Sequence, residues 1–254
     1  MRVLVTRPEQ QASRWTEQLC GRGFDAVALP LIEIAPAPRP QALHRAWQEL
    51  GRFRAVMFVS GNAVRHFFAH RPNGACWPRG TRAWAPGNGT GEALIGAGVG
   101  ADLLDAPGPN ATQFDSQVLW PQVAGQVRAG DRVLIVRGDD ARAHGAPRDW
   151  LAAQLGAAGA RVQAVAAYVR ATPVLDEAQR AHAMLGVTQG VWLFSSSQAI
   201  ANLQQLLPTH QWTRARAVVT HSRIADVAHL AGFGVVCESR PTLESVAAAL
   251  ESFR

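Results

Sequence analysis

Short apolar runs recur along the chain. Each run is followed by a few small or polar residues and then by a segment in which apolar residues repeat at helical spacing. The runs, each predicted to be a strand, occupy residues 3–6, 55–60, 83–85, 132–136, 191–195 and 217–220. The helical segments follow at residues 9–19, 63–69, 90–97, 150–157, 199–206 and 224–231. This repeated order predicts an α/β fold in which parallel sheets are flanked by helices.

The two halves of the chain resemble each other in sequence. "FVSGNAVRHF" at 58–67 aligns with "FSSSQAIANL" at 194–203, and "IGAGV" at 95–99 aligns with "HLAGF" at 229–233, with nearly the same spacing. Two copies of one α/β unit would explain this pattern. The alternative is that any two strand–helix segments share these common residue types.

Two stretches without helical or strand spacing suggest how the two copies are joined. One is "APAPRPQ" at 35–41, which is rich in proline, and the other begins at "YVRATPVLDE". The predicted division is domain one at 1–36 plus 172–254 and domain two at 38–167, with linkers at about 35–41 and 168–175. A chain that crosses twice between two similar domains is expected to form a ligand cleft beside both linkers. The single tyrosine, Tyr168, falls at the edge of the second linker.

The charge pattern restricts the class of ligand that the protein is expected to bind. The chain of 254 residues has a formal net charge of +6, and every basic side chain is an arginine because there is no lysine. The absence of lysine excludes a Schiff-base lysine and the lysine of a Walker-type phosphate loop. The arginines occur singly rather than in clusters, which favours an acidic small molecule over nucleic acid.

The start of the chain and its cysteines suggest a compartment and the absence of a metal. "MRVLVTRPEQ" leads directly into a predicted strand, and no apolar stretch is long enough for a membrane span, so we expect a cytoplasmic protein. Cys20, Cys76 and Cys237 form neither a C-x-x-C pair nor a zinc-like spacing with histidine. We therefore expect no metal, no disulfide framework and three buried or inert thiols.

Polar turns follow the predicted strands. In parallel α/β sheets, ligands bind at the carboxyl ends of strands, where helix N-termini offer free N–H groups to anions. The structural alternative is that these hydroxyl and amide side chains only cap helices. The turns are Thr6-Arg7-Pro8, Ser60-Gly61-Asn62, Gly87-Asn88-Gly89-Thr90, Arg137-Gly138, Ser195-Ser196-Ser197 and Thr220-His221-Ser222.

Familiar catalytic motifs are missing from these turns. Neither Ser60 nor the serines at 195–197 lie in a G-x-S-x-G elbow, and "PGNGTG" is not a G-x-G-x-x-G dinucleotide loop. His221 is predicted to be a loop histidine without a chemical role, although its turn remains a candidate for binding. The adjacent Asp139 and Asp140 are expected to be solvated rather than to form an acid pair or metal site. Neutral donors and arginines would act mainly by holding a flexible anion in one conformation.

Taken in order, the stretches resemble the uroporphyrinogen-III synthase family along essentially the whole chain. The resemblance rests on the opening "VLVTRPEQQASRWTEQLCGRGFDAVALPLIEI" and on later motifs with the family's order and spacing. These are "VMFVSGNAVRHFF", "PGNGTGEAL", "FDSQVLW", "RVLIVRGDDAR", "VAAYVR", "FSSSQAI" and "PTLESVAAAL".

This resemblance implies a fold and an activity. The fold is two α/β domains joined by a double linker, with the substrate in the cleft. The activity is cofactor-free conversion of the linear tetrapyrrole hydroxymethylbilane into uroporphyrinogen III. In that reaction water is lost and the last pyrrole ring, ring D, is inverted through a spirocyclic intermediate. The substrate carries many carboxylates, which suits a basic protein.

The resemblance also implies roles for particular residues. Tyr168 matches the family's tyrosine proposed to assist departure of the ring A hydroxyl. Residues that match positions lining the family's cleft are Ser60, Asn62, Thr90, Ser195 and Ser197, with the backbone around Gly61, Gly87, Arg137 and Gly138. Two departures stand out. The turn from His221 to Ala225 replaces a G-x-x-T-A motif and displaces its hydroxyl, and Gln117 stands where the family has glutamate.

Two other functions remain open from the sequence. A non-catalytic two-domain binding protein for an anionic small molecule would show the same turns, and a nucleic-acid-binding protein would explain the basic charge. For the synthase we expect a monomer that binds neither nucleic acid nor a membrane. It could receive substrate by transient contact with the preceding enzyme of the pathway.

Overall fold

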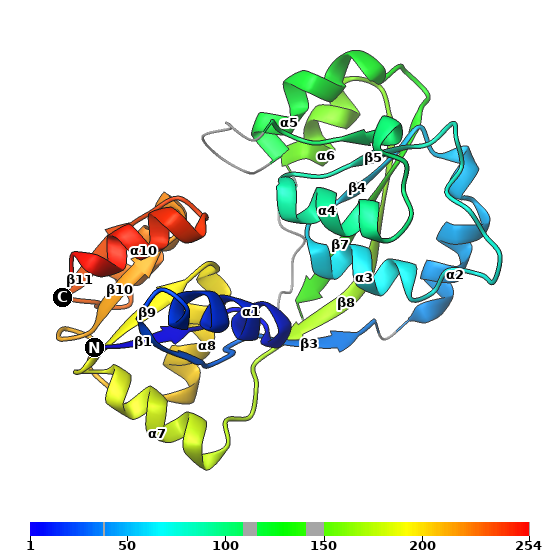
Figure 1. Ribbon diagram of the computed structural model, residues 1–254. Coiled ribbons are helices and arrows are strands. Elements are labelled where there is room, and N and C mark those ends of the chain that lie inside the picture. The colour runs from blue at the N-terminus through cyan, green and yellow to red at the C-terminus, as the bar shows by residue number, and fades with distance from the viewer. Residues whose placement is uncertain (38, 109–115, 141–149, 254) are drawn as a thin grey trace. The chain divides into compact units, whose positions relative to one another are not determined.

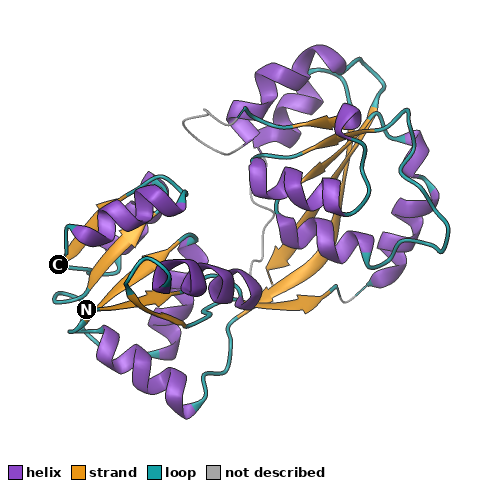
Figure 2. Cartoon of the chain, viewed as in Figure 1, coloured by secondary structure: helices purple, strands orange, loops and turns teal. Residues whose placement is uncertain are grey.

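The computed structural model describes residues 1–37, 39–108, 116–140 and 150–253, except for the Asp140 side chain. These residues form two compact units (Figures 1 and 2). Unit 1 comprises Met1–Ile34 and Ala171–Arg254, and unit 2 comprises Ala35–Arg170. Within the described residues, no helix combines the length and apolar character needed to cross a membrane.

Unit 1 is built on a five-stranded sheet in the order β11-β10-β9-β1-β2, in which every pair is parallel. The strands are β1 Arg2–Val5, β2 Asp25–Ala28, β9 Gly190–Phe194, β10 Arg216–Val219 and β11 Val235–Glu238. The helices are α1 Glu9–Cys20, α7 Glu177–Gly186, α8 Ser197–Leu206, α9 Ser222–Leu230 and α10 Leu243–Glu251.

Both faces of this sheet are buried, because successive side chains of a strand point to opposite faces. Leu4 and Trp192 pack with α7, α8 and α9 on one face, whereas Val3 and Leu193 pack with α1 and α10 on the other. The central strands are therefore continuous apolar runs rather than alternating ones. This is why β1, β9 and β10 were predictable from sequence.

Unit 2 contains a six-stranded sheet in the order β3-β8-β7-β4-β5-β6. The strands are β3 Glu33–Pro36, β4 Ala55–Phe58, β5 Arg82–Trp84, β6 Leu104–Asp105, β7 Arg132–Asp140 and β8 Arg161–Ala171. The α-helices are α2 Pro40–Gln48, α3 Gly61–Phe68, α4 Asn88–Gly96, α5 Ser116–Val123 and α6 Trp150–Ala157. The short 3-10 helices are η1 Leu50–Arg52, η2 Ala101–Leu103 and η3 Ala124–Gln126.

The core of unit 2 is again divided by the sheet. Met57 and Ile135 pack with α5 and α6. An aromatic group fills another part of the core, where the Trp47 ring of α2 stacks on Phe67 of α3 at 4.9 Å and Phe58 of β4 meets Phe67 edge-on. The α/β class with parallel sheets flanked by helices is confirmed.

Both predicted linker stretches are partly regular structure. Ala35 and Pro36 belong to β3, an edge strand that tolerates proline, and Pro40 begins α2 at a position where a missing N–H costs little. Tyr168 lies inside β8, which is paired with β7 as far as Arg170. The expectation of irregular structure is wrong at these positions, because proline and short polar residues do not prevent an edge strand or a first helical turn.

Candidate active site

The turn after β4 begins α3 and contains three of the predicted substrate-binding residues. Ser60 is the N-cap of α3, and its Oγ accepts a hydrogen bond from the Ala63 N–H at 3.2 Å. Gly61 is the half-buried first residue of the helix, whereas Asn62 is only 5% exposed. Ser60 and Gly61 are therefore presented at this strand end, and the Asn62 side chain is turned toward the protein.

The turn after β5 has a similar form. Gly87 precedes α4 as its N-cap and is buried, and Thr90, in the first turn of α4, is 8% exposed. Asn88 and Gly89 are exposed at the start of the helix. At this turn the backbone N–H groups of the helix start are a better candidate for anion binding than the threonine hydroxyl.

Tyr168 is buried in β8, with 1% of its surface exposed, and its hydroxyl has two polar contacts. Arg170 Nη2 donates a hydrogen bond to the Tyr168 oxygen at 3.0 Å. Ser60 Oγ lies 3.1 Å from the same oxygen, and either hydroxyl can be the donor. The phenol is thus fixed beside the N-terminus of α3, at the carboxyl end of β4.

Gly138 leaves space for the tyrosine ring. It pairs with Tyr168 across β7 and β8, next to a bulge between Arg137 and Gly138. A Cβ atom at position 138 would lie 2.5 Å from two ring carbons of Tyr168 and 2.9 Å from its hydroxyl oxygen. The predicted Arg137-Gly138 turn is in fact part of a long strand, where Gly138 supports Tyr168 and Arg137 is half-buried.

His66 of α3 completes the surroundings of the phenol, with its ring centroid 5.7 Å from that of Tyr168. Burial lowers the pKa of His66, and the nearby positive charges of Arg65 and His70 lower this pKa further. The neutral imidazole is therefore the favoured form beside the phenol.

The lowered pKa of His66 predicts acid-sensitive stability. The unfolded chain takes up a proton near the ordinary histidine pKa of about 6.5, whereas the folded chain does so only at lower pH. The contribution is fully present above about pH 6.5 and is lost as pH falls toward the folded pKa. Melting temperatures measured across this range should fall less steeply for His66→Gln than for the natural chain. Equal slopes would contradict this assignment.

In unit 1, the turn after β1 contains one side chain whose donor is already hydrogen-bonded and one with an unpaired donor among the described residues. The Thr6 side chain is 1% exposed, and its hydroxyl donates to the Leu193 carbonyl at 2.8 Å. Thr6 therefore holds β1 to β9. Its one proton is used within the sheet and is not available to a substrate carboxylate, so its predicted role as a substrate contact stays a prediction.

Arg7 is the side chain with the unpaired donor. Its guanidinium carbon lies 4.2 Å from the Trp15 ring centroid, and its buried Nε has no partner among the described residues. Burial lowers the pKa of Arg7 to about 10, so the side chain stays cationic at neutral pH. A desolvated cation without a paired carboxylate in the described part of the chain is suited to binding an anion.

Arg7→Met provides a test of this role, because methionine keeps the apolar stem but removes the donors. If Arg7 binds a substrate carboxylate, KM should rise about tenfold with little change in kcat, the size expected for one charged hydrogen bond. Thermal stability should stay level or increase, since a desolvated charge is removed. Arg14→Met, at an exposed position of α1, is the matched control. An unchanged KM in Arg7→Met would contradict the assignment.

The turns after β9 and β10 both cap helices. Ser196 is the N-cap of α8 and accepts from the Gln198 N–H at 3.2 Å, and Ser195 and Ser197 are half-buried beside it. His221 caps α9, since its Nδ1 accepts from the Arg223 N–H at 3.1 Å.

The capping role assigned to His221 fixes its tautomer. A neutral imidazole whose Nδ1 accepts has its proton on Nε2, and the buried Nε2 has no partner among the described residues. Thr220 is half-buried and Ser222 is exposed. The imidazole of His221 thus has a structural role, because it caps the helix in place of a hydroxyl, and its lack of a chemical role stays a prediction.

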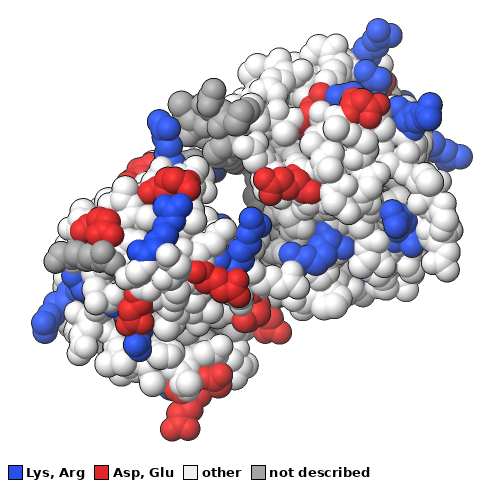
Figure 3. Space-filling view, viewed as in Figure 1, with Lys and Arg blue, Asp and Glu red and all other residues white. Residues whose placement is uncertain are grey.

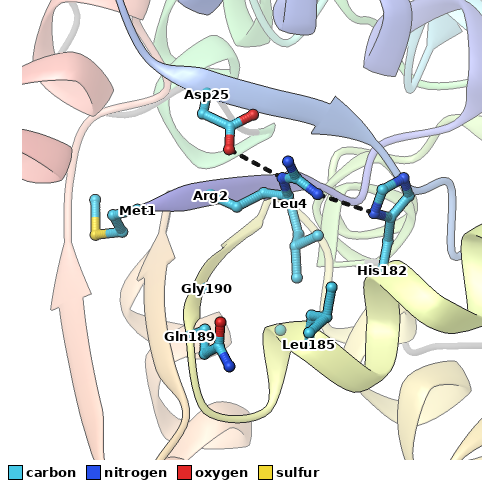
Figure 4. A pocket seen from close by; sticks show the side chains of 9 residues that line it. Met1, Arg2, Leu4, Asp25, His182, Leu185, Gln189 and Gly190 are labelled. Carbon is cyan, nitrogen blue, oxygen red and sulfur yellow. Dashed lines mark hydrogen bonds and ion pairs between the residues drawn. The ribbon is translucent and has the colours of Figure 1, made fainter.

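A cavity of about 330 Å³ lies at the opposite end of the unit 1 sheet (Figure 4). It is lined by Leu4, Gly190 and the polar side chains of Arg2, Asp25 and His182, among others. Arg2 Nε donates to Asp25 Oδ2 at 3.0 Å, and Arg2 Nη1 lies 3.4 Å from His182 Nδ1. These three side chains pair with one another at the amino ends of β1 and β9, and they belong to no predicted turn.

Other sequence predictions can be placed as well. Cys20 and Cys76 are exposed and Cys237 is half-buried, so of the two expected alternatives burial is excluded and inertness stays a prediction. Asp139 is exposed, and the Asp140 side chain lies outside the described residues, as do the start of "FDSQVLW" and the end of "RVLIVRGDDAR". Among the described residues, no three metal-ligating side chains form a cluster. On the face in Figure 3, arginines and carboxylates are interspersed rather than gathered in one positive patch.

Comparison with known proteins places this arrangement in a family. The family model of uroporphyrinogen-III synthase HemD matches residues 13–248, which is most of the chain. The chain belongs to the uroporphyrinogen-III synthase family. The resemblance inferred from the motifs is thereby confirmed.

Individual relatives agree with this family. A uroporphyrinogen-III synthase from Chlorobaculum parvum is 34% identical over 108 residues, covering 40% of this chain and 41% of the relative. The porphyrin biosynthesis protein HemD of Ruminiclostridium josui is 27% identical over 137 residues, covering 53% of this chain and 26% of the relative. The matched segments thus span less than half the length of both curated relatives.

Solved structures show the same fold over the whole chain. A mutant uroporphyrinogen-III synthase of the extremely thermophilic bacterium Thermus thermophilus has a TM-score of 0.58 at 18% identity, with 100% of this chain and 97% of that chain covered. The synthetase of Helicobacter pylori has a TM-score of 0.59 at 16% identity, with both chains covered completely. The family's two-domain α/β fold is therefore that of this chain.

Two members of the phenol site were missed by sequence reasoning, Arg170 and His66. Arg170 could have been found, because residues two apart on a strand point to the same face and Tyr168 has an arginine two positions later. The position of His66 depends on how α3 packs on the sheet, against β7 and β4, which one sequence does not reveal.

Proposed function

We propose that this chain is a uroporphyrinogen-III synthase, converting hydroxymethylbilane into uroporphyrinogen III with inversion of ring D through a spirocyclic intermediate. Family membership supports the reaction class. The observation that carries the proposal is the single tyrosine, held at its hydroxyl by Ser60 and Arg170. A phenol fixed in this way can donate a proton at one defined place.

Tyr168 is the proposed acid in the first step. The bond between the ring A methylene carbon and its hydroxyl oxygen breaks, and the electron pair stays with the oxygen. The phenol proton converts the departing hydroxyl to water. The phenolate then takes back the proton that is released when ring D closes the macrocycle, so the enzyme is regenerated without a cofactor.

The helix starts, Arg7 and the imidazole N–H of His221 are the proposed holders of the substrate carboxylates. In unit 2 these are Ser60, Gly61 and the backbone at the start of α4, and in unit 1 they are Arg7, the start of α8 and His221 Nε2. Many weak contacts to carboxylates would hold the flexible linear tetrapyrrole folded, with its ring D near its ring A. A monomeric state, a cytoplasmic location and transfer of substrate from the preceding enzyme stay predictions.

The product isomers provide the test of this activity. Freshly generated hydroxymethylbilane closes without an enzyme to isomer I, so purified protein should shift the product to isomer III. Heat-denatured protein and Tyr168→Phe serve as controls. Binding of the bilane without any isomer III would favour the two-domain binding protein. Retention of DNA or RNA that weakens steeply with salt would favour a nucleic-acid-binding protein.

A further inference from the structure

The guanidinium of Arg170 contacts both the hydroxyl and the ring of Tyr168. Because the two residues are two positions apart on β8, their side chains leave the same face of the strand. Arg170 Nη2 is 3.0 Å from the phenol oxygen, and the guanidinium carbon is 5.4 Å from the ring centroid. Arg170 is therefore the cationic neighbour of the proposed acid.

The donors around the phenol define a direction for its proton. A guanidinium has no acceptor, so the Tyr168 oxygen accepts from Arg170. Ser60 Oγ already accepts from the Ala63 N–H, which favours donation of the serine proton to Tyr168. With two hydrogen bonds accepted by its oxygen, the phenol has its own proton left to give to a third partner.

We propose that Arg170 positions Tyr168 for proton donation and also binds a carboxylate of the substrate beside it. The inference rests on the proposed synthase activity. A guanidinium has five N–H donors, and the contact with the phenol uses one. The remaining donors can hold a carboxylate in bidentate geometry, which brings the ring carrying it to the acid.

This role also explains how a buried phenol meets a substrate. Tyr168 is 1% exposed, and its covering neighbours Ser60 and Gly138 are small. Arg170 is half-buried and has a long side chain that can shift toward an arriving carboxylate. When the proton has left, donation from Arg170 and Ser60 stabilises the negative charge on the phenol oxygen until a proton returns.

Variants at position 170 separate the two contacts. Arg170→Met should lower kcat about tenfold and raise KM about tenfold, the size of one charged hydrogen bond each. Arg170→Lys keeps the charge but lacks the planar fork, so it should restore KM more than kcat. Arg161→Met is the matched control, because Arg161 is exposed at the other end of the same strand. This control should have the kcat and the KM of the natural chain.

A double-mutant cycle with Tyr168→Phe distinguishes positioning from a general structural effect. In the Tyr168→Phe background, Arg170→Met should no longer lower kcat but should still raise KM. An equal loss of kcat in both backgrounds would overturn the positioning role, and an unchanged KM would overturn the carboxylate contact. If Arg170→Met does not fold, Arg170→Lys replaces it in the cycle. Absence of isomer III from the natural chain would instead refute the proposed function itself.

Discussion

Tyr168→Phe is expected to lower kcat by about ten- to a hundredfold while the protein remains folded. General acid catalysis contributes about 10²–10⁴-fold, and a loss at or below the lower limit of that range is expected where water or another donor partly replaces the phenol. The ring fills the same space in the variant, so the packing against Gly138 and His66 is retained. The value of kcat is obtained from the steady-state formation of isomer III, measured in parallel for the variant and the natural chain.

The stability of Tyr168→Phe must be measured in parallel. Loss of the hydroxyl removes the contact with Ser60, worth about 1 kcal/mol, and the charged contact with Arg170, worth about 1.5–3 kcal/mol, so the melting temperature should fall by several degrees. KM should change little, since the phenol acts on the departing hydroxyl rather than on a carboxylate. Full activity in this variant would remove the phenol from the mechanism.

Gly138→Ala is expected to reduce activity nearly as much as Tyr168→Phe and to destabilise the fold as well. The new Cβ would lie 2.5 Å from the tyrosine ring carbons, so the ring must move away from Ser60 and Arg170. Forcing a methyl group into a packed site costs about 1–3 kcal/mol. Chemical denaturation measures this loss, and the same preparation is assayed for isomer III.

Gly125→Ala is the matched control for this substitution. Gly125 lies in the same unit, and no atom lies close to the position of an added Cβ. We expect nearly natural activity and stability from this control. If Gly138→Ala behaved like Gly125→Ala, the close packing of Gly138 against Tyr168 would not matter for the reaction.

The central strands were predictable because their physical signal is strong. β1, β4, β9 and β10 are buried on both faces and therefore appear as continuous apolar runs before polar turns. The sequence patterns did not reveal the edge strands β3, β6 and β11, which are short and partly exposed. Their pairing is determined by neighbouring strands more than by their own residues.

The turns of the site were predictable, but the direction of their side chains was not. Helix starts at Ser60, Ser196 and His221 follow from strand ends and capping residues. Whether a polar residue faces solvent depends on how each helix packs, which is why Thr6 proved to be used inside the sheet. Tyr168 was singled out because it is unique in the sequence, whereas Ser60 and Gly138 are brought to it only by the pairing of β7 with β4 and with β8.

The most direct test of the proposed activity is the isomer composition formed from hydroxymethylbilane by the natural chain in amounts far below those of the substrate. Isomer III should predominate, and its rate of formation should be proportional to protein concentration. Formation of isomer I alone, at the rate seen without protein, would contradict it.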